Sequence, residues 1–229
     1  MNTVHNVAVI GFLAAMLLTA DATGAELAST PVPGGCDTPA SQQGEDIGCY
    51  LLATQSLKRL PADGKIFWHL YTYSNRASAE AAQKGSTGTV VESFGKIWLL
   101  AIADSKWRPP GGNRVAVVGP LPVAAAKAYT ARYMQAVFPP QQNMRTSIHQ
   151  HSGPEAWYVV SGAQCLLTPK ETLVIRAGEG GFVRAGASMQ LTSIGTETRR
   201  AMVLVLHDES QPWMTFTSDW SPTTQCPEA

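Results

Sequence analysis

Two histidines and a glutamate lie close together in the second half of the chain, in a spacing that suits metal binding. His149 and His151 are two residues apart, so in an extended strand both side chains point to the same face. Residues 152–154 (Ser-Gly-Pro) favour a turn, after which the returning chain can bring Glu155 over that face. Two imidazoles and one carboxylate are typical protein ligands for a divalent transition metal.

The spacing of these residues resembles the first sequence motif of the cupin superfamily, which reads Gly, five residues, His-x-His, three or four residues, Glu, six residues, Gly. The five fixed positions are occupied here by Asn143, His149, His151, Glu155 and Gly162. Only the opening glycine differs, and asparagine also tolerates a left-handed turn. The resemblance covers about residues 128–208. It implies a jelly-roll barrel in which the two histidines and the glutamate hold one divalent ion: zinc, iron, manganese, nickel or copper.

The second cupin motif has lost its characteristic ligand in this sequence. Gly178 and Gly186 place its register, and Met189 then stands where the motif has a third histidine. A thioether is a weak ligand for zinc, iron or manganese, although copper accepts it. Because three protein ligands suffice for a catalytic site with open positions, we predict a bound metal, with Met189 or His207 as a candidate fourth ligand. The alternative is a fold that has kept its glycines and lost its metal.

Strand parity predicts which residues line a pocket beside these ligands. Arg145 and Ser147 share a face with the histidines, and Trp157 shares a face with Glu155. An arginine beside a metal would favour an anionic substrate such as a carboxylate. A surface arginine with a packed aliphatic stem is the simpler interpretation. The predicted substrate pocket consists of Arg145, Ser147, Trp157 and Gln190, and no catalytic residue is assigned.

The elements that position the site are predicted to be mainly β. Residues 126–210 are expected to form the barrel, and residues 211–229 a C-terminal tail across its surface. Residues 128–138 fit either a helix or a strand, and the resemblance favours a strand. Further strands are predicted at residues 145–151 and 155–160, which pair as a hairpin, and at 164–168, 172–176 and 199–207. Arg199 and Arg200 are interpreted as solvated charges at a strand end, with an anion contact as the alternative.

Upstream of the barrel, residues 26–125 are predicted to form an N-terminal arm and a small α/β extension. Residues 49–60 carry a weak helical stripe that ends at a proline, which favours a short helix. His69 stands among aromatic residues and is interpreted as a packed core residue rather than a ligand. Strands are predicted at residues 66–73, 89–93, 96–103 and 114–118, and a helix at residues 76–84.

The N-terminus and the cysteines both indicate export. Residues 7–18 form an apolar run followed by small residues, so residues 1–25 are predicted to be a signal peptide, with an anchoring or buried helix as the alternative. The even number of cysteines suggests two disulfides in a periplasmic or secreted protein. Of three pairings, we favour the local one, which joins Cys36 with Cys49 and Cys165 with Cys226.

Composition and motif together limit the classes of function that we expect for this protein. The formal net charge is zero and no basic patch occurs, so nucleic acid is not an expected partner. We favour a metal-dependent lyase, isomerase or dioxygenase that acts on a small organic substrate. A non-enzymatic small-molecule-binding or sensing protein, metal-free or not, and a structural envelope protein are the alternatives. A homodimer without membrane contact after signal cleavage is expected, and the substrate and reaction stay open.

Overall fold

The structure is a computed structural model that describes residues 35–44, 46–57, 60, 65–84, 86–124, 127–140 and 144–227. The predicted signal peptide and Asn143 lie outside these ranges. The described chain is mainly β, as predicted, and contains one α-helix and one short 3-10 helix, η1 (Ala40–Gln42). Within the described residues, no helix is both long and apolar enough to cross a membrane.

A five-stranded antiparallel sheet runs through the centre of the molecule. Its strands, in spatial order, are β1 (Gly48–Leu57), β6 (Tyr129–Phe138), β13 (Arg199–Asp208), β8 (Glu155–Ser161) and β11 (Gly180–Val183). The central strand β13 is buried along almost its whole length, because both faces of the sheet are covered. This confirms the strand predicted from apolar residues on both faces.

A second layer closes the barrel below the central sheet. It contains β10 (Thr172–Arg176), β9 (Ala163–Leu167) and β12 (Gln190–Ile194), together with the pair β7 (His149–His151) and β14 (Met214–Phe216). Backbone bridges from Arg145 to Thr192 and from His149 to Met189 join the segment that contains β7 to the edge of β12. The two layers enclose an apolar interior, as in a jelly roll.

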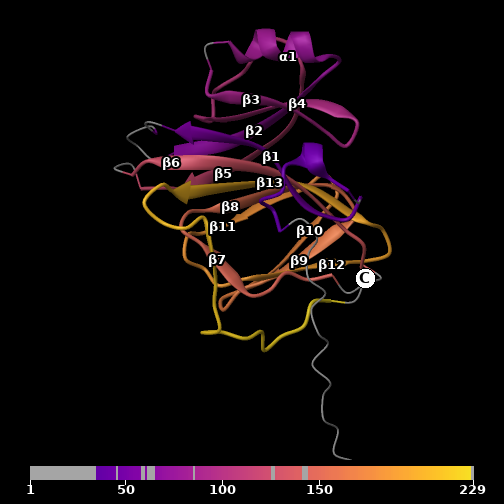
Figure 1. Cartoon of the computed structure of the whole chain (residues 1–229), viewed down its shortest axis with the longest axis vertical. Coiled ribbons are helices and arrows are strands. Elements are labelled where there is room, and N and C mark those ends of the chain that lie inside the picture. The colour runs from indigo at the N-terminus through magenta and orange to yellow at the C-terminus, as the bar shows by residue number, and fades with distance from the viewer. Residues whose placement is uncertain are drawn as a thin grey trace, which may run out of the picture.

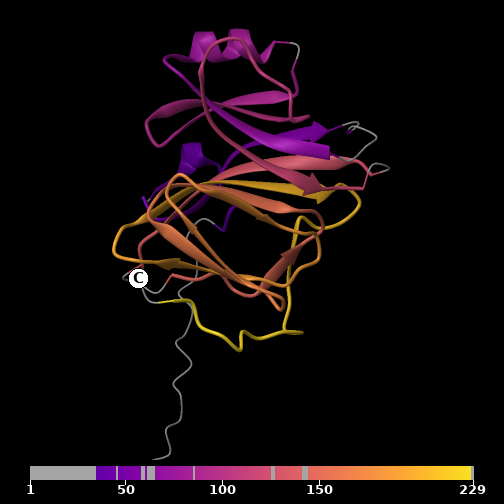
Figure 2. The same cartoon turned by 180° about the vertical axis from the view of Figure 1, so that it is seen from behind.

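The N-terminal extension packs on the outer face of the central sheet. It consists of β3 (Gly88–Ser93), β4 (Lys96–Ala103), β2 (Lys65–Tyr73) and β5 (Asn113–Pro122), with α1 (Arg76–Gln83) on top. Figure 1 shows the succession from α1 through the extension and the central sheet to the second layer, and Figure 2 shows it from behind. A core that includes Trp68, Trp98, Tyr133 and Leu204 joins the extension to the barrel.

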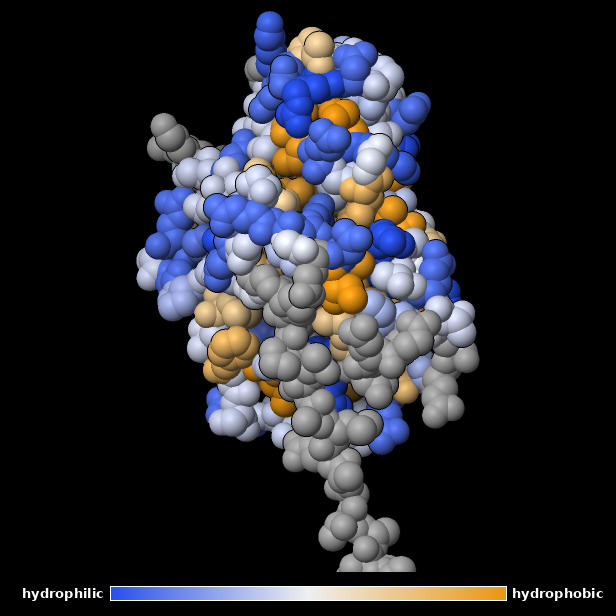
Figure 3. Space-filling view, turned by 45° about the vertical axis from the view of Figure 1, so that its right-hand side comes forward, coloured by the Kyte–Doolittle hydropathy of each residue, from blue (hydrophilic) through white to orange (hydrophobic). Residues whose placement is uncertain are grey.

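Two disulfides attach peripheral segments to the barrel. Cys36 is bonded to Cys49 at the start of β1, and Cys165 of β9 is bonded to Cys226 in the tail, which confirms the local pairing. On the face shown in Figure 3, hydrophobic residues occur in small groups among hydrophilic ones. Among the described residues, the large hydrophobic side chains that are exposed are Val117 and Phe216.

Two predicted elements are wrong. Residues 49–60 begin not with a helix but with the strand β1, whose pairing with β6 outweighs the weak helical stripe. The expected hairpin of residues 145–151 and 155–160 does not form, because β7 pairs with β14 whereas β8 pairs with β13 and β11. The chain crosses from one layer to the other at residues 152–154. The strand interpretation of residues 128–138 is confirmed as β6.

Candidate metal centre

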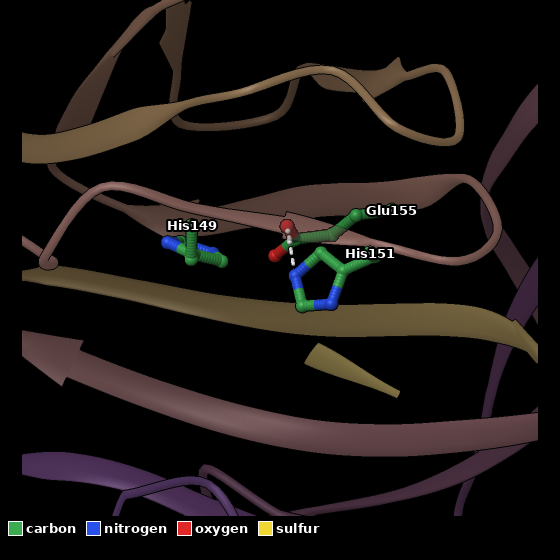
Figure 4. A group of neighbouring side chains, drawn as sticks. All are labelled: His149, His151 and Glu155. Carbon is green, nitrogen blue, oxygen red and sulfur yellow. Dashed lines mark ion pairs between the residues drawn. The ribbon is translucent and has the colours of Figure 1, made fainter. Parts of the chain in front are cut away.

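The crossing between β7 and β8 brings the three predicted ligands together inside the barrel. His149 and His151 project from one layer and Glu155 projects from the other (Figure 4). One potential ligand atom from each residue lies within 4.8 Å of the others, and all three side chains are buried. The predicted convergence therefore occurs across the barrel interior rather than along a hairpin.

Backbone carbonyls fix the orientation of both imidazole rings. Nδ1 of His149 lies 2.8 Å from the carbonyl oxygen of Ser147, and Nδ1 of His151 lies 2.7 Å from that of Trp213. Because a carbonyl oxygen only accepts hydrogen bonds, Nδ1 must carry the proton in each neutral ring. The lone pairs of both Nε2 atoms are then available, as in histidines that bind a metal and donate their other N–H to a carbonyl.

The C-terminal tail supports His151 through more than one contact. Besides offering its carbonyl oxygen, Trp213 stacks its ring on that of His151 at a centroid distance of 5.4 Å. The guanidinium of Arg132 lies 4.4 Å from the Trp213 ring and also donates to Asp37. Sequence reasoning missed Trp213 because 62 residues separate it from His151 and no local pattern connects them.

One oxygen of the Glu155 carboxylate accepts a hydrogen bond, and the other oxygen is open to a ligand. Nε1 of Trp157 donates to Oε1 at 2.9 Å. Oε2 lies 3.0 Å from Nε2 of His151 (Figure 4), yet no donor in the described chain makes a well-directed hydrogen bond to it. A buried carboxylate oxygen that faces two imidazole nitrogens suits a cation between them.

Burial and mutual charge set the protonation of the three groups. Burial lowers the pKa of His149 below its usual value. Burial acts to lower the pKa of His151 as well. The nearby Glu155 carboxylate has the larger effect in total, so the pKa of His151 is raised. Burial acts to raise the pKa of Glu155, yet the two histidines and the Trp157 hydrogen bond lower it overall. At neutral pH the site therefore carries a carboxylate, which favours binding a cation.

The donor set and its surroundings fit one divalent transition metal. Two imidazole nitrogens and one carboxylate oxygen are ordinary ligands, and their partners on the far side orient them for binding. Met189, the candidate fourth ligand, is buried beside His149, and the two residues exchange backbone hydrogen bonds of 2.9 and 3.1 Å. A barrel of two layers with this cluster inside is the arrangement that the motif implied. This domain has the cupin fold.

Comparisons with known proteins give partial similarities to cupins. Similar solved structures are a cupin-like protein from Thermotoga maritima (14% identity, 38% of this chain, 64% of that chain, TM-score 0.34) and a DMSP lyase from Ruegeria pomeroyi (16%, 46%, 51%, 0.34). A cupin superfamily protein from Desulfitobacterium hafniense is also similar (9%, 38%, 74%, 0.31). The chain thus spans less than two thirds of the length of the first two. No family model and no curated protein matches the chain.

A cavity of about 260 Å³ adjoins the ligands in this cupin barrel. Of the predicted pocket residues, Arg145, Ser147 and Trp157 line it, whereas Gln190 does not. The side chain of Gln190 donates instead to the carbonyl oxygen of Thr146. Most of the remaining lining is apolar and includes Met134, Ala136, Phe138, Leu191, Val203 and Val205.

The structure also shows where two other residues discussed in the sequence analysis, His207 and Arg199, lie relative to the cavity. His207, the other candidate fourth ligand, is outside both the ligand cluster and the cavity lining, and its Nδ1 lies 3.3 Å from the carbonyl oxygen of Asp208. Arg199 was interpreted as a solvated charge, which is wrong, because it is only 1% exposed and lines the cavity. Its even spacing from Val203 and Val205 along β13 was the available signal. Arg200 is exposed, as expected.

Proposed function

We propose that this protein is an exported enzyme that binds one divalent transition metal through His149, His151 and Glu155 and acts on a small organic molecule in the adjoining cavity. One observation carries the proposal: three buried ligand atoms converge within 4.8 Å, and the partners of these side chains outside the cluster bind only their other polar atoms. The cavity volume of about 260 Å³ lies just below the usual range for ligand sites, which suits a small molecule.

The surrounding residues would each have a defined task in such a site. A bound divalent metal supplies a Lewis acid that polarises a carbonyl or carboxylate oxygen of the substrate. The apolar lining excludes water and thereby strengthens electrostatic interactions within the cavity. Trp157 and Trp213 hold the ligands Glu155 and His151 in position. Lyase, isomerase and dioxygenase chemistry all remain compatible with this arrangement.

The two disulfides indicate that the protein matures in an oxidising compartment. Together with the apolar N-terminal run in the sequence, they support the proposal of a periplasmic or secreted location. The homodimer expected from the sequence stays a prediction, which sedimentation velocity checks.

The direct test is the metal content of the mature protein, purified without a histidine tag. We expect about one equivalent of a single metal in the unmodified protein and less than about a tenth of that in the double variant His149→Ala/His151→Ala. His207→Ala serves as the matched control, because His207 lies outside the cluster and should not alter the metal content. Equal metal content in the double variant, or no metal after reloading, would contradict the proposal.

Metal binding is expected to release a proton at pH values below the raised pKa of His151. In the metal-free protein the pKa of His151 is raised by Glu155, so below that pKa a metal must displace a proton from Nε2. The apparent affinity should therefore fall, by up to about tenfold per pH unit, as the pH decreases through this pKa. Titration calorimetry in buffers of different ionisation enthalpy measures the released protons. An affinity that is constant between pH 8 and pH 5 would show that His151 is not a ligand.

A second function, binding of a small molecule without turnover, is favoured by one observation. Met189 lines the cavity and stands where the motif has its third histidine, and its thioether is a weak ligand for most divalent metals. This alternative predicts that a cavity ligand stabilises the protein against heat but is recovered unchanged after long incubation. If the ligand is converted to a product, and a chelator abolishes this conversion, the protein is an enzyme.

A further inference from the structure

Arg199 is a buried cation that forms no ion pair with a carboxylate of the described chain. It begins β13, faces the barrel interior and is 1% exposed. In the described part of the chain, no carboxylate lies within ion-pair distance of its guanidinium. Buried arginines are normally paired, because an uncompensated charge in an apolar interior is costly. A charge kept under these conditions points to a partner that is not part of the protein.

The hydrogen bonds around Arg199 leave a group of donors unused. Its Nε donates to Oε1 of Gln164 at 2.7 Å, and its guanidinium lies 5.2 Å from the ring centroid of Phe138. Both terminal nitrogens of Arg199 and Nε2 of Gln164 are buried and have no hydrogen-bond partner among the described residues. These three nitrogens carry N–H groups only, so the partner that they lack must be an acceptor.

The backbone of Arg199 lies far along β13 from the strand position that faces the metal centre. Val205 pairs with Glu155, and Arg199 is six residues earlier, which separates the two backbone positions on β13 by about 20 Å. The Glu155 carboxylate nevertheless acts on the charge of the Arg199 side chain and favours its charged form. In the other layer, His149 bridges to Met189, whereas Arg145 bridges to Thr192, next to the residue that pairs with Gln164. The cavity therefore has a metal end and an end with two arginines, Arg145 and Arg199, which we call the arginine end.

The charges that line the cavity favour an anion. Arg145, Arg199 and Glu155 are its charged lining residues, so the sum is positive when the histidines are neutral, and a divalent metal would make it more positive. The lining between the two ends is mainly apolar. Forked guanidinium donors match the two oxygens of a carboxylate.

We propose that the substrate is a small organic acid, whose carboxylate binds Arg199 and Gln164 at the arginine end and whose other end lies at the metal. This deepens the proposed function, on which it rests only for the role of the metal end. The hydrogen bonds and charge of the arginine end are independent of any metal, so the carboxylate site is complete in the metal-free protein. The apolar lining accommodates the carbon chain that joins the two ends.

The test compares unbranched acids from acetate to octanoate with the corresponding amides, by calorimetric titration of chelator-treated protein. An amide has the same shape and lacks the charge, so the ratio of the two affinities isolates the carboxylate interaction. We expect the best-bound acid to bind about tenfold or more tightly than its amide. Arg199→Gln should reduce this ratio to about one. Arg200→Gln, at the exposed neighbouring position, is the matched control and should leave the ratio unchanged.

Each outcome has a definite meaning. If no acid is preferred over its amide by the unmodified protein, a result that needs no variant, the inference is overturned. It is also overturned if folded Arg199→Gln keeps the preference. Metal content is measured on untreated and metal-reloaded portions of the same protein preparations. An absent acid preference in a protein that binds one metal equivalent overturns this inference alone, whereas a retained preference in a protein that binds no metal overturns the proposed function alone.

Discussion

Gly153→Ala is expected to lower the free energy of unfolding by about 3 kcal/mol or more. A Cβ atom on Gly153 would lie 1.5 Å from the carbonyl oxygen of Leu206 and 2.7 Å from its carbonyl carbon. Both atoms belong to the backbone of the central strand β13, which cannot shift without breaking its pairing with β6 and β8. The amide of Leu206 also donates to the carbonyl oxygen of Pro154 at 3.0 Å, which holds the turn against β13.

The same substitution should weaken the metal centre, because the turn at Gly153 joins the strands of His151 and Glu155. Urea unfolding measures the stability effect, and metal titration measures the effect on the site. Gly44→Ala is the control, since nothing lies within 4 Å of its added Cβ, and it should change stability by less than about 0.5 kcal/mol. A Gly153→Ala variant as stable as this control would show that the turn does not approach β13 so closely.

Trp157→Ala is expected to cost about 3–5 kcal/mol of stability. The side chain is fully buried in the barrel core and also lines the cavity, so its removal leaves a void and takes the donor from Glu155. Trp157→Phe separates the two effects, because it keeps most of the apolar volume and loses only the indole N–H. We expect the phenylalanine variant to bind metal about tenfold more weakly, with a stability loss near 1–2 kcal/mol.

Trp98→Phe provides a close control for this experiment. Trp98 is also fully buried, and its Nε1 donates to the carbonyl oxygen of Ser93 at 2.9 Å, but it belongs to the core between the extension and the central sheet. Its replacement should cause a comparable loss of stability and leave metal affinity unchanged. If both phenylalanine variants bind metal as the unmodified protein does, the hydrogen bond from Trp157 does not position Glu155.

The fold and the convergence of the three candidate ligands were predictable because their signals are local. His149, His151 and Glu155 lie within seven positions, and their spacing specifies convergence even though the hairpin expected to produce it does not form. Strand β13 was evident from apolar residues on both faces, and β6 from the resemblance. The sequence left three cysteine pairings open, and the structure shows the local one that was favoured.

The residues that complete the site were not predictable because their roles depend on distant partners. Trp213 contacts His151 only after the tail has folded back to form β14 beside β7. Arg199 resembles a strand-end charge until the layer containing Gln164 covers it. The strand β1 has a weak helical pattern, and only pairing with β6 gives it an extended conformation.

The central sheet has a different interior on each of its two faces. Along β13, Met202, Leu204 and Leu206 pack with the extension, whereas Ala201, Val203 and Val205 belong to the barrel core. A large apolar core therefore contributes to stability without touching the cavity. Substitutions on the cavity side can alter ligand preference while this other core maintains the folded state. Because alternate positions of one strand serve stability and ligand binding separately, ligand specificity can change during evolution without loss of the fold.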